Sequence, residues 1–346
     1  MLTVSLITLG SPDQLTGGYL YHRRMANLAP AHDARVDFAS VPAAPFLPAV
    51  AASRQVAQAA KAADVIVVDS LAAAFLAPWR LPRPAVAILH QPPGGIDGGP
   101  GRRAVQSWLD RALYRRCDVL LLASRTLVDT VPGRRCVVVP PGSDVALPPP
   151  GPLPDLRQGR RVAILTVGNW LPRKGILDVL AAFAGLPPGA GTLHLVGRTD
   201  QDPSYADRVR ERLAAPELDS RVVVHGPLPP EEIGPLYAAA DVFVLPSYEE
   251  AYGTVYGEAL AAGLPVVGWR VGNLTNLVVD GREGLMLEPG DVNGLASALE
   301  HLASDDQYRE RLAAAARLGG RGLPTWSETA SLFFNTLKGI AERARP

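Results

Sequence analysis

Short apolar runs that alternate with helical patterns are the feature that most constrains the fold of this chain. In the first 150 residues we expect strands at 2–9, 35–39, 65–69, 85–90, 119–123 and 136–139. Helical patterns lie between these runs, near 19–28, 49–62, 104–115 and 125–131. This alternation is typical of βαβ units, whose right-handed crossovers place helices on both faces of a parallel sheet. Because a similar alternation begins again with an apolar run at 161–167, the sequence predicts an α/β protein.

The length of the chain and one proline-rich stretch predict two domains. A chain of 346 residues is longer than one hydrophobic core usually supports. The stretch PPGSDVALPPPGPLPDL begins at Pro140 and is too rich in proline for a helix or a central strand. We therefore expect domains at 1–150 and 151–325, followed by a terminal helix at 326–346.

Composition excludes several classes of function. The formal net charge is zero, with 15 basic and 10 acidic residues (+5) before residue 151 and 19 basic and 24 acidic residues (−5) after it. Neither half is basic enough to indicate nucleic-acid binding. No apolar run approaches the roughly 20 residues of a membrane span, and no signal peptide is recognisable. Cys117 and Cys136 have no metal-binding spacing, so we expect a cytoplasmic protein with free thiols.

An arginine cluster in the first half leaves two interpretations open. The segment GRRAVQSWLDRALYRRCD places Trp108 and Leu109 among Arg102, Arg103, Arg111, Arg115 and Arg116. A basic helix with interleaved apolar residues can contact the inner face of a membrane or an acidic acceptor. An amphipathic helix with its apolar side on the sheet explains the same residues.

The stretch VLPSYEEAYGTVYGEALAAGLPVVG, residues 244–268, is the strongest functional signal. It reads as the end of a buried strand, a loop, a helix and a second strand. Glu250 lies in the loop and Glu258 in the helix, while Gly253, Thr254 and Val255 open that helix. Helix N-termini and the carboxyl ends of parallel strands bind phosphate, so this stretch predicts a phosphate site flanked by two carboxylates.

Two other interpretations of these glutamates are possible. A glycosidase needs its carboxyl groups roughly 5–9.5 Å apart, depending on mechanism. Eight helical residues span roughly 12 Å, so the pair suits two hydroxyl-binding groups better than an acid and a base. An ordinary solvated surface loop is the remaining alternative.

The motif PSYEEAYGTVYGEALAAGLPVV resembles the Glu-x7-Glu signature of the family 4 retaining glycosyltransferases. The resemblance implies the GT-B fold, in which two Rossmann-like domains have parallel sheets that face each other across a cleft. It also implies that Glu250 contacts the donor sugar and that Glu258 holds the ribose of the nucleotide.

A second segment, GNWLPRKGILDVLAAF, resembles the diphosphate-binding segment of the same family. It contains Lys174, one of only three lysines beside 31 arginines, and a lysine before a helix can act as a point charge on phosphate. The resemblance implies that Lys174 binds phosphate. Asn169 stands where many members have arginine, so Arg173 is the candidate second cation.

The segment VGNLTN supplies a further candidate phosphate contact. Gly272 and Asn273 open a short helix whose amides can bind an anion. The family commonly has Gly-Gly followed by Glu, whereas this chain has Asn273 and Asn276. We therefore expect only the backbone of this segment to take part.

The first half contributes its own candidates at two strand ends. Gly17 and Gly18 precede a helix and allow a close backbone approach, although they do not form a G-x-G-x-x-G fingerprint. His90 ends a strand before the irregular stretch QPPGGIDGGPG. The resemblance implies that the glycines face the cleft and that His90 contacts the donor sugar. His22 and Arg23 are weaker acceptor-side candidates, which a solvated helix face explains equally well.

Together with these features, the resemblance implies a retaining glycosyltransferase that moves a hexosyl group from a nucleotide diphosphate sugar to a hydroxyl of a sugar, a lipid-linked sugar or a small molecule. His90 and Glu250 are the expected catalytic residues, with no cofactor. No Asp-x-Asp follows a strand to hold a metal, so metal-independent chemistry is expected. A nucleotide-sugar epimerase or phosphorylase, or a non-catalytic nucleotide-sugar binder, remains an alternative on the same fold.

Overall fold

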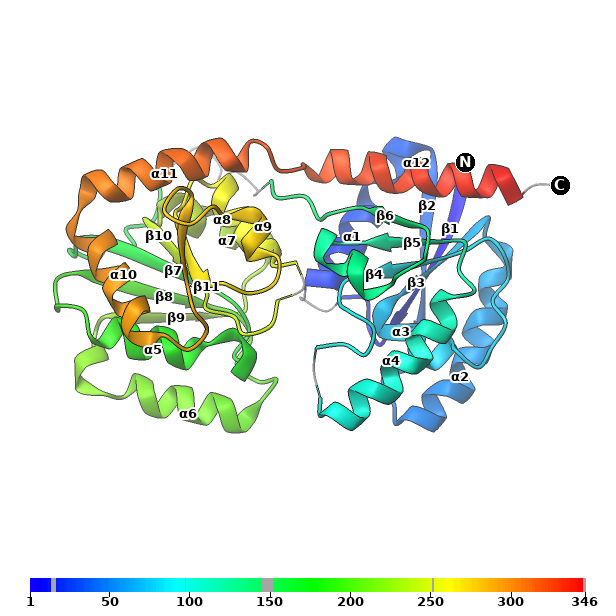
Figure 1. Cartoon of the computed structure of the whole chain (residues 1–346), viewed down its shortest axis with the longest axis horizontal. Coiled ribbons are helices and arrows are strands. Elements are labelled where there is room, and N and C mark those ends of the chain that lie inside the picture. Colours follow the sequence, from blue (N-terminus) through cyan, green and yellow to red (C-terminus); the bar gives the residue numbers. More distant parts are fainter. Residues whose placement is uncertain (14–16, 97, 145–151, 251, 345–346) are drawn as a thin grey trace. The chain divides into compact units, whose positions relative to one another are not determined.

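A computed structural model describes residues 1–13, 17–96, 98–144, 152–250 and 252–344. The chain divides into two compact units, one comprising Met1–Gly142 with Pro324–Pro346 and the other comprising Ser143–Leu323 (Figure 1). The domain boundary expected near residue 150 lies outside the described residues. Each unit is an α/β structure built on a parallel sheet, which confirms the predicted fold class.

The first unit contains a six-stranded parallel sheet in the order β2-β1-β3-β4-β5-β6. Its strands are β1 (Leu2–Leu9), β2 (Ala34–Val41), β3 (Val65–Asp69), β4 (Ala85–Leu89), β5 (Val119–Leu122) and β6 (Cys136–Val138). The central strands consist almost entirely of valine, isoleucine, leucine and alanine, because helices cover both of their faces. All six strands lie within a few residues of the expected ranges.

Two groups of helices cover this sheet. One core layer joins the strands to α1 (Gly17–Leu28) and α12 (Trp326–Ala344). The opposite layer contains α2 (Phe46–Ala59), α3 (Ser70–Leu76) and α4 (Pro100–Tyr114). Phe333 and Phe334 of α12 are completely buried against the first sheet, and the Trp326 ring meets the Tyr21 ring at 5.7 Å. Helix α12 is therefore part of the core of the first unit.

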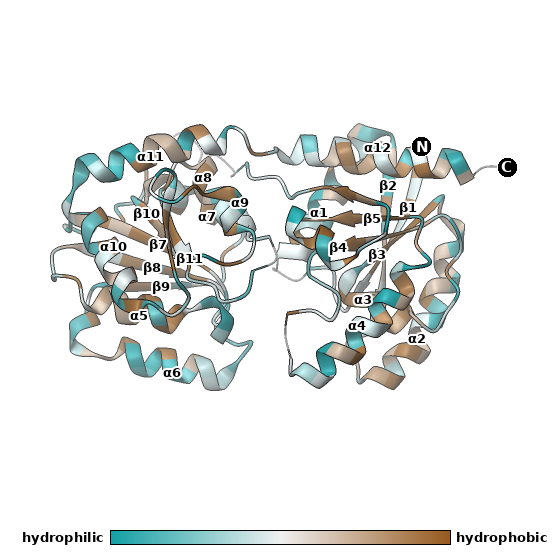
Figure 2. Cartoon of the chain, in the orientation of Figure 1, coloured by the Kyte–Doolittle hydropathy of each residue, from teal (hydrophilic) through white to brown (hydrophobic). Residues whose placement is uncertain are grey.

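The second unit contains another six-stranded parallel sheet, in the order β12-β11-β10-β7-β8-β9. Its strands are β7 (Val162–Val167), β8 (Gly191–Val196), β9 (Val222–Gly226), β10 (Val242–Val244), β11 (Val266–Trp269) and β12 (Gly284–Leu287). Its helices are α5 (Ile176–Ala184), α6 (Pro203–Leu213), α7 (Pro230–Ala239), α8 (Thr254–Ala261), α9 (Leu274–Leu277), α10 (Val292–Ser304) and α11 (Asp306–Gly320). Figure 2 shows the apolar strands inside each unit and the polar residues on the outer sides of the helices.

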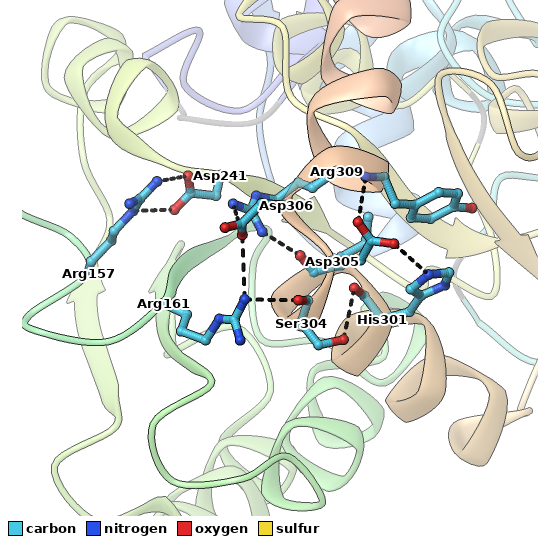
Figure 3. A network of polar contacts seen from close by, with 10 residues as sticks. Arg157, Arg161, Asp241, His301, Ser304, Asp305, Asp306 and Arg309 are labelled. Atoms are coloured by element: carbon cyan, nitrogen blue, oxygen red, sulfur yellow. Dashed lines mark hydrogen bonds and ion pairs between the residues drawn. The ribbon is translucent and has the colours of Figure 1, made fainter.

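A network of ion pairs joins elements at the amino-terminal edge of the second sheet (Figure 3). Arg157 donates from Nε to Asp241 Oδ2 at 2.9 Å, and Asp241 also accepts from the Ala163 amide. Arg161 contacts Asp306 and the carbonyl of Ser304, which connects the start of β7 to the turn between α10 and α11. These side chains lie mostly on the surface, and Arg161 and Asp241 precede their strands. The network therefore belongs to the edge opposite the strand ends where parallel sheets bind ligands.

None of the helices in the described parts of the chain is long and apolar enough to cross a bilayer.

Candidate functional site

Three loops at one edge of the second sheet carry the predicted donor-binding residues. Strands β7, β10 and β11 are neighbours in the sheet, and all three run parallel. The loops that leave their carboxyl ends span 168–175, 245–253 and 270–273. Parallel strands end at the same edge, so the topology brings these three segments together.

Lys174 and Glu250 form an ion pair across two of these loops. The Lys174 ammonium contacts Glu250 Oε2, and the two side chains are only 14% and 12% exposed. Gly175 follows Lys174 with a φ of 68°, and a Cβ there would lie 2.3 Å from the carbonyl oxygen of Pro246. Only glycine fits this approach without a shift of the backbone. The Tyr248 amide also donates to the Arg173 carbonyl at 2.7 Å, which holds the lysine turn against the glutamate loop.

Two glycines with positive φ fix the loop that carries Glu250. A Cβ on Gly272 (φ 58°) would lie 2.0 Å from the carbonyl oxygen of Glu250. A Cβ on Gly253 (φ 73°) would lie 2.4 Å from the Tyr256 ring and 3.0 Å from Cγ of Glu250. Glu250 therefore lies against the segment after β11 and against the start of α8.

The start of α8 presents backbone amides beside this loop, and Glu258 lies on the next turn. Gly253 is the N-cap, and the first-turn amides of Thr254 and Val255 have no partner within the helix. Glu258 Oε2 accepts from the Tyr237 hydroxyl at 3.0 Å. Tyr237 is fully buried, and its burial together with the charge of Glu258 raises the pKa of the phenol. Tyr237 thus stays protonated and orients the carboxylate.

The asparagines that depart from the family pattern have structural partners. The Asn273 side chain is buried, donates to the Tyr252 carbonyl at 3.1 Å and accepts from Asn276 at 3.1 Å. Asn169 Oδ1 accepts from the Arg198 amide at 3.0 Å, which ties it to the loop after β8. The Arg173 side chain is half-exposed at the surface of the lysine turn. These contacts assign Asn169 and Asn273 to loop structure, while their binding roles stay predictions.

A second polar cluster lies at the carboxyl edge of the first sheet, around Asp69 at the end of β3. Asp69 Oδ2 accepts from the Thr8 hydroxyl at 3.1 Å and lies 3.2 Å from His22 Nε2. The Ser70 hydroxyl donates to Oδ1 at 3.1 Å. Burial opposes ionisation of Asp69, but His22, together with His90 and the Leu71 amide, outweighs it and lowers the pKa of Asp69 to about 2. Asp69 is therefore a buried carboxylate anion at neutral pH.

His90 follows β4, the strand next to β3, and its ring is packed on several sides. The rings of Tyr21 and His22 lie 5.0 and 4.9 Å from it, and a Cβ on Gly18 would lie 3.4 Å from His90 Cδ2. Burial, followed by repulsion from His22, lowers the pKa of His90 to about 3, so the ring is neutral at neutral pH. Its Nε2 has no hydrogen-bond partner among the described residues. A neutral imidazole with an unused nitrogen can donate to or accept from a hydroxyl group.

Sequence reasoning missed part of this cluster. The alternative in which His22 lies on a solvated helix face is wrong, because His22 is 1% exposed and pairs with Asp69. Asp69 itself was overlooked, although an aspartate that ends the apolar run VIVVD is a recognisable signal. Gly17 begins α1 in an exposed position, whereas Gly18 lies against His90.

The donor atoms of His22, Asp69 and His90 lie within 4.8 Å of one another. Two imidazoles and a carboxylate are donor types that zinc accepts. Ligating histidines usually donate their second ring nitrogen to a protein acceptor, but His22 Nδ1 has no hydrogen-bond partner in the described parts of the chain. The cluster therefore fits a polar contact site better than a metal centre.

Comparison with known proteins places the second unit beside glycosyl transferases. Residues 161–305 match the family model described as "Glycosyl transferases group 1". A curated D-inositol 3-phosphate glycosyltransferase from Corynebacterium efficiens is 34% identical over 209 residues, which cover 57% of this chain and 49% of that protein. The matched part thus spans about half the length of this relative.

Solved structures match over nearly the whole chain. Sucrose-phosphate synthase from Thermosynechococcus elongatus superposes with a TM-score of 0.84 at 20% identity, covering 99% of this chain and 100% of that one. HepE from Anabaena, solved in complex with UDP-glucose, gives a TM-score of 0.80 at 22% identity, covering 97% of this chain and 100% of that one. The chain therefore has the GT-B fold, and its second unit contains the segment that resembles group 1 glycosyl transferases.

Proposed function

We propose that this protein is a retaining glycosyltransferase that moves a hexosyl group from a nucleotide diphosphate sugar to an acceptor hydroxyl. The arrangement of Lys174, Glu250 and the first turn of α8 at one strand edge carries the proposal. The family match over 161–305 and the UDP-glucose complex of HepE support it, because both point to nucleotide sugars.

The donor diphosphate binds where the positive groups of this edge converge. Lys174 supplies a cation that is largely removed from water, and the amides of Thr254 and Val255 supply oriented dipoles. Arg173 and the backbone of Gly272 complete the candidate phosphate contacts. Glu258, oriented by Tyr237, accepts hydrogen bonds from the ribose hydroxyls.

Transfer breaks the bond between the anomeric carbon and a phosphate oxygen and forms a bond to the acceptor oxygen. The acceptor proton passes to the departing phosphate oxygen on the same face of the sugar, which retains the anomeric configuration. Lys174 and the helix dipole stabilise the charge that develops on the leaving diphosphate, so no metal is needed for that task. Glu250 accepts hydrogen bonds from the sugar hydroxyls once the phosphate has replaced it as the partner of Lys174.

In the first unit, His90 is the residue that we expect to contact a sugar hydroxyl. Its neutral ring and unused Nε2 suit that role at physiological pH. We also propose a cytoplasmic location, in line with the free thiols of Cys117 and Cys136. The acceptor is a sugar, a lipid-linked sugar or a small molecule.

The test is an NMR assay of the purified protein with UDP-, GDP- and ADP-sugars and a panel of monosaccharide acceptors, with and without EDTA. We expect one donor to be consumed at the same rate in EDTA and its anomeric configuration to persist in the product. Asp200→Asn, which removes an exposed ion pair with Arg198 in the same unit, is the control that keeps full activity. Inversion, dependence on a divalent cation, or turnover that requires inorganic phosphate contradicts the proposal.

A further inference from the structure

Helix α4 exposes apolar side chains on the side that faces away from the first sheet. Trp108 is 66% exposed and Val105 is 62% exposed. The buried residues of the helix are Asp110, Leu113 and Tyr114. Leu113 and Tyr114 thus pack on the sheet, as expected for an amphipathic helix, whereas Trp108 and Val105 lie on the exposed side.

The exposed residues form a continuous strip along the helix, which we call the outward stripe. It consists of small or apolar residues whose spacing follows helical turns, namely the exposed Gly101, Ala104, Val105 and Trp108 and the half-buried Ala112. Steps of three and four residues place side chains on one helix face. A continuous apolar strip on the outer face of a helix is typical of a site that binds another apolar surface.

Arginines flank the outward stripe on both sides. At 100° per residue, Arg111 lies along one border of the stripe and Arg102 along the other, while Arg115 follows the stripe at the end of the helix. None of these three has an ion pair with any carboxylate in the described ranges. The only acid of the helix, Asp110, is 1% exposed and accepts from the Gly94 amide at 2.9 Å. The outer side of α4 thus combines apolar surface with three arginines that form no ion pair with a described carboxylate.

We propose that the outward stripe of α4 is a docking surface for an anionic lipid membrane. Trp108 and Val105 enter the boundary between headgroups and acyl chains, while the helix lies in the plane of that boundary. The flanking arginines extend along the surface and place their guanidinium groups at the level of the phosphates. A bilayer offers both features along the full length of the stripe, since apolar chains lie beneath a layer of negative charge. This surface lies in the first unit and does not depend on donor binding by the second.

Arg116 differs from the flanking arginines although it follows them in sequence. Its guanidinium donates to the carbonyl oxygens of Ala77 and Trp79 at 2.6 and 2.9 Å. It therefore fastens the end of α4 to the loop after α3 and is left out of the test.

The experiment is cosedimentation of the full chain with vesicles of phosphatidylcholine alone or of phosphatidylcholine with phosphatidylglycerol. We expect binding to the anionic vesicles only, and binding that weakens as salt is added. Each of Arg102→Gln, Arg111→Gln and Arg115→Gln should weaken partitioning about fivefold. Trp108→Ser should also reduce partitioning, and Arg111→Lys should retain most of it because the charge is kept.

Two control variants distinguish binding through the outward stripe from non-specific binding of the protein to vesicles. Arg80→Gln removes an exposed arginine of the first unit outside α4, and Leu318→Ser removes a side chain that is as exposed as Trp108. Both should bind like the parent protein. The proposal is overturned if anionic vesicles do not bind the protein, if neutral vesicles bind it equally, or if the α4 variants bind unchanged. A concentration-dependent dimer that Trp108→Ser abolishes would assign the stripe to a second copy of the chain instead.

Discussion

Lys174 and Glu250 form an ion pair at the carboxyl edge of the second sheet, and both side chains are largely buried. A phosphate that binds Lys174 must therefore compete with Glu250. The same glutamate is the candidate for contact with the donor sugar, so the pair couples phosphate binding to the position of the sugar-binding carboxylate.

Substitutions of this pair should separate binding from transfer. Lys174→Gln should weaken binding of the nucleoside diphosphate and slow transfer, because the cation is lost from both steps. Glu250→Gln should strengthen binding of the free nucleoside diphosphate, since Lys174 is released, yet it should slow transfer. Calorimetric titration and the transfer assay check both effects. Loss of nucleotide binding in Glu250→Gln would contradict the competition.

Gly272 tests the contact that shapes the Glu250 loop. Gly272→Ala places a methyl group 2.0 Å from the Glu250 carbonyl oxygen and adds a positive-φ cost of about 1–2 kcal/mol. Gly281→Ala is the matched control, because its φ is 75° and nothing lies within 4 Å of the added atom. Both should lower the urea midpoint, but only Gly272→Ala should also weaken donor binding. Equal donor affinities in the two variants would show that the contact does not position Glu250.

The hydrogen bond from Tyr237 to Glu258 should act on affinity through the orientation of the carboxylate. Tyr237→Phe removes the hydroxyl that donates at 3.0 Å and keeps the buried ring. We expect donor affinity to fall roughly 10–150-fold, as for the loss of a hydrogen bond to a charged group worth about 1.5–3 kcal/mol. Titration calorimetry measures this change, with Tyr205→Phe as a control on a tyrosine whose hydroxyl accepts from the Leu177 amide. An unchanged donor affinity would show that Tyr237 does not contribute to donor binding.

The cluster around Asp69 predicts acid sensitivity of the first unit. Burial and His22 lower the pKa of His90 from 6.5 to about 3, so between these values the unfolded chain binds a proton that the folded chain does not. The contribution of His90 is therefore present above pH 6.5 and is lost as the pH falls towards 3. Asp69, whose pKa falls from 3.8 to about 2, adds a further loss only below about pH 4.

Urea unfolding at a series of pH values checks this prediction through the midpoint concentration. His90→Gln should flatten the decline between pH 6.5 and 3. His32→Gln is the control, because that histidine stacks on Phe334 away from Asp69. A decline that is equally steep in both variants would assign the acid sensitivity to other groups.

Most strands and helices of this protein can be predicted from its sequence, because buried parallel strands are short runs of apolar residues. The apolar runs predict the strands, and the spacing of Glu250, Gly253 and Glu258 predicts a loop followed by a helix start. The side chains that these residues contact are harder to predict from the sequence. Tyr237, which orients Glu258, lies 21 residues away on another helix, and Asp69 meets His22 across 47 residues. Such contacts depend on which strands are neighbours in the sheet. The order of the strands cannot be predicted from the local spacing of apolar residues.

The proposed function depends most on nucleotide binding at the edge formed by β7, β10 and β11. The most direct measurement is a thermal-shift titration with UDP, GDP, ADP and their sugars on the parent protein and on Glu258→Ala. A nucleotide at 100 times its dissociation constant should stabilise the parent by about 2.7 kcal/mol, and Glu258→Ala should lose that shift. No shift with any nucleotide, or an equal shift in Glu258→Ala, would contradict the central claim.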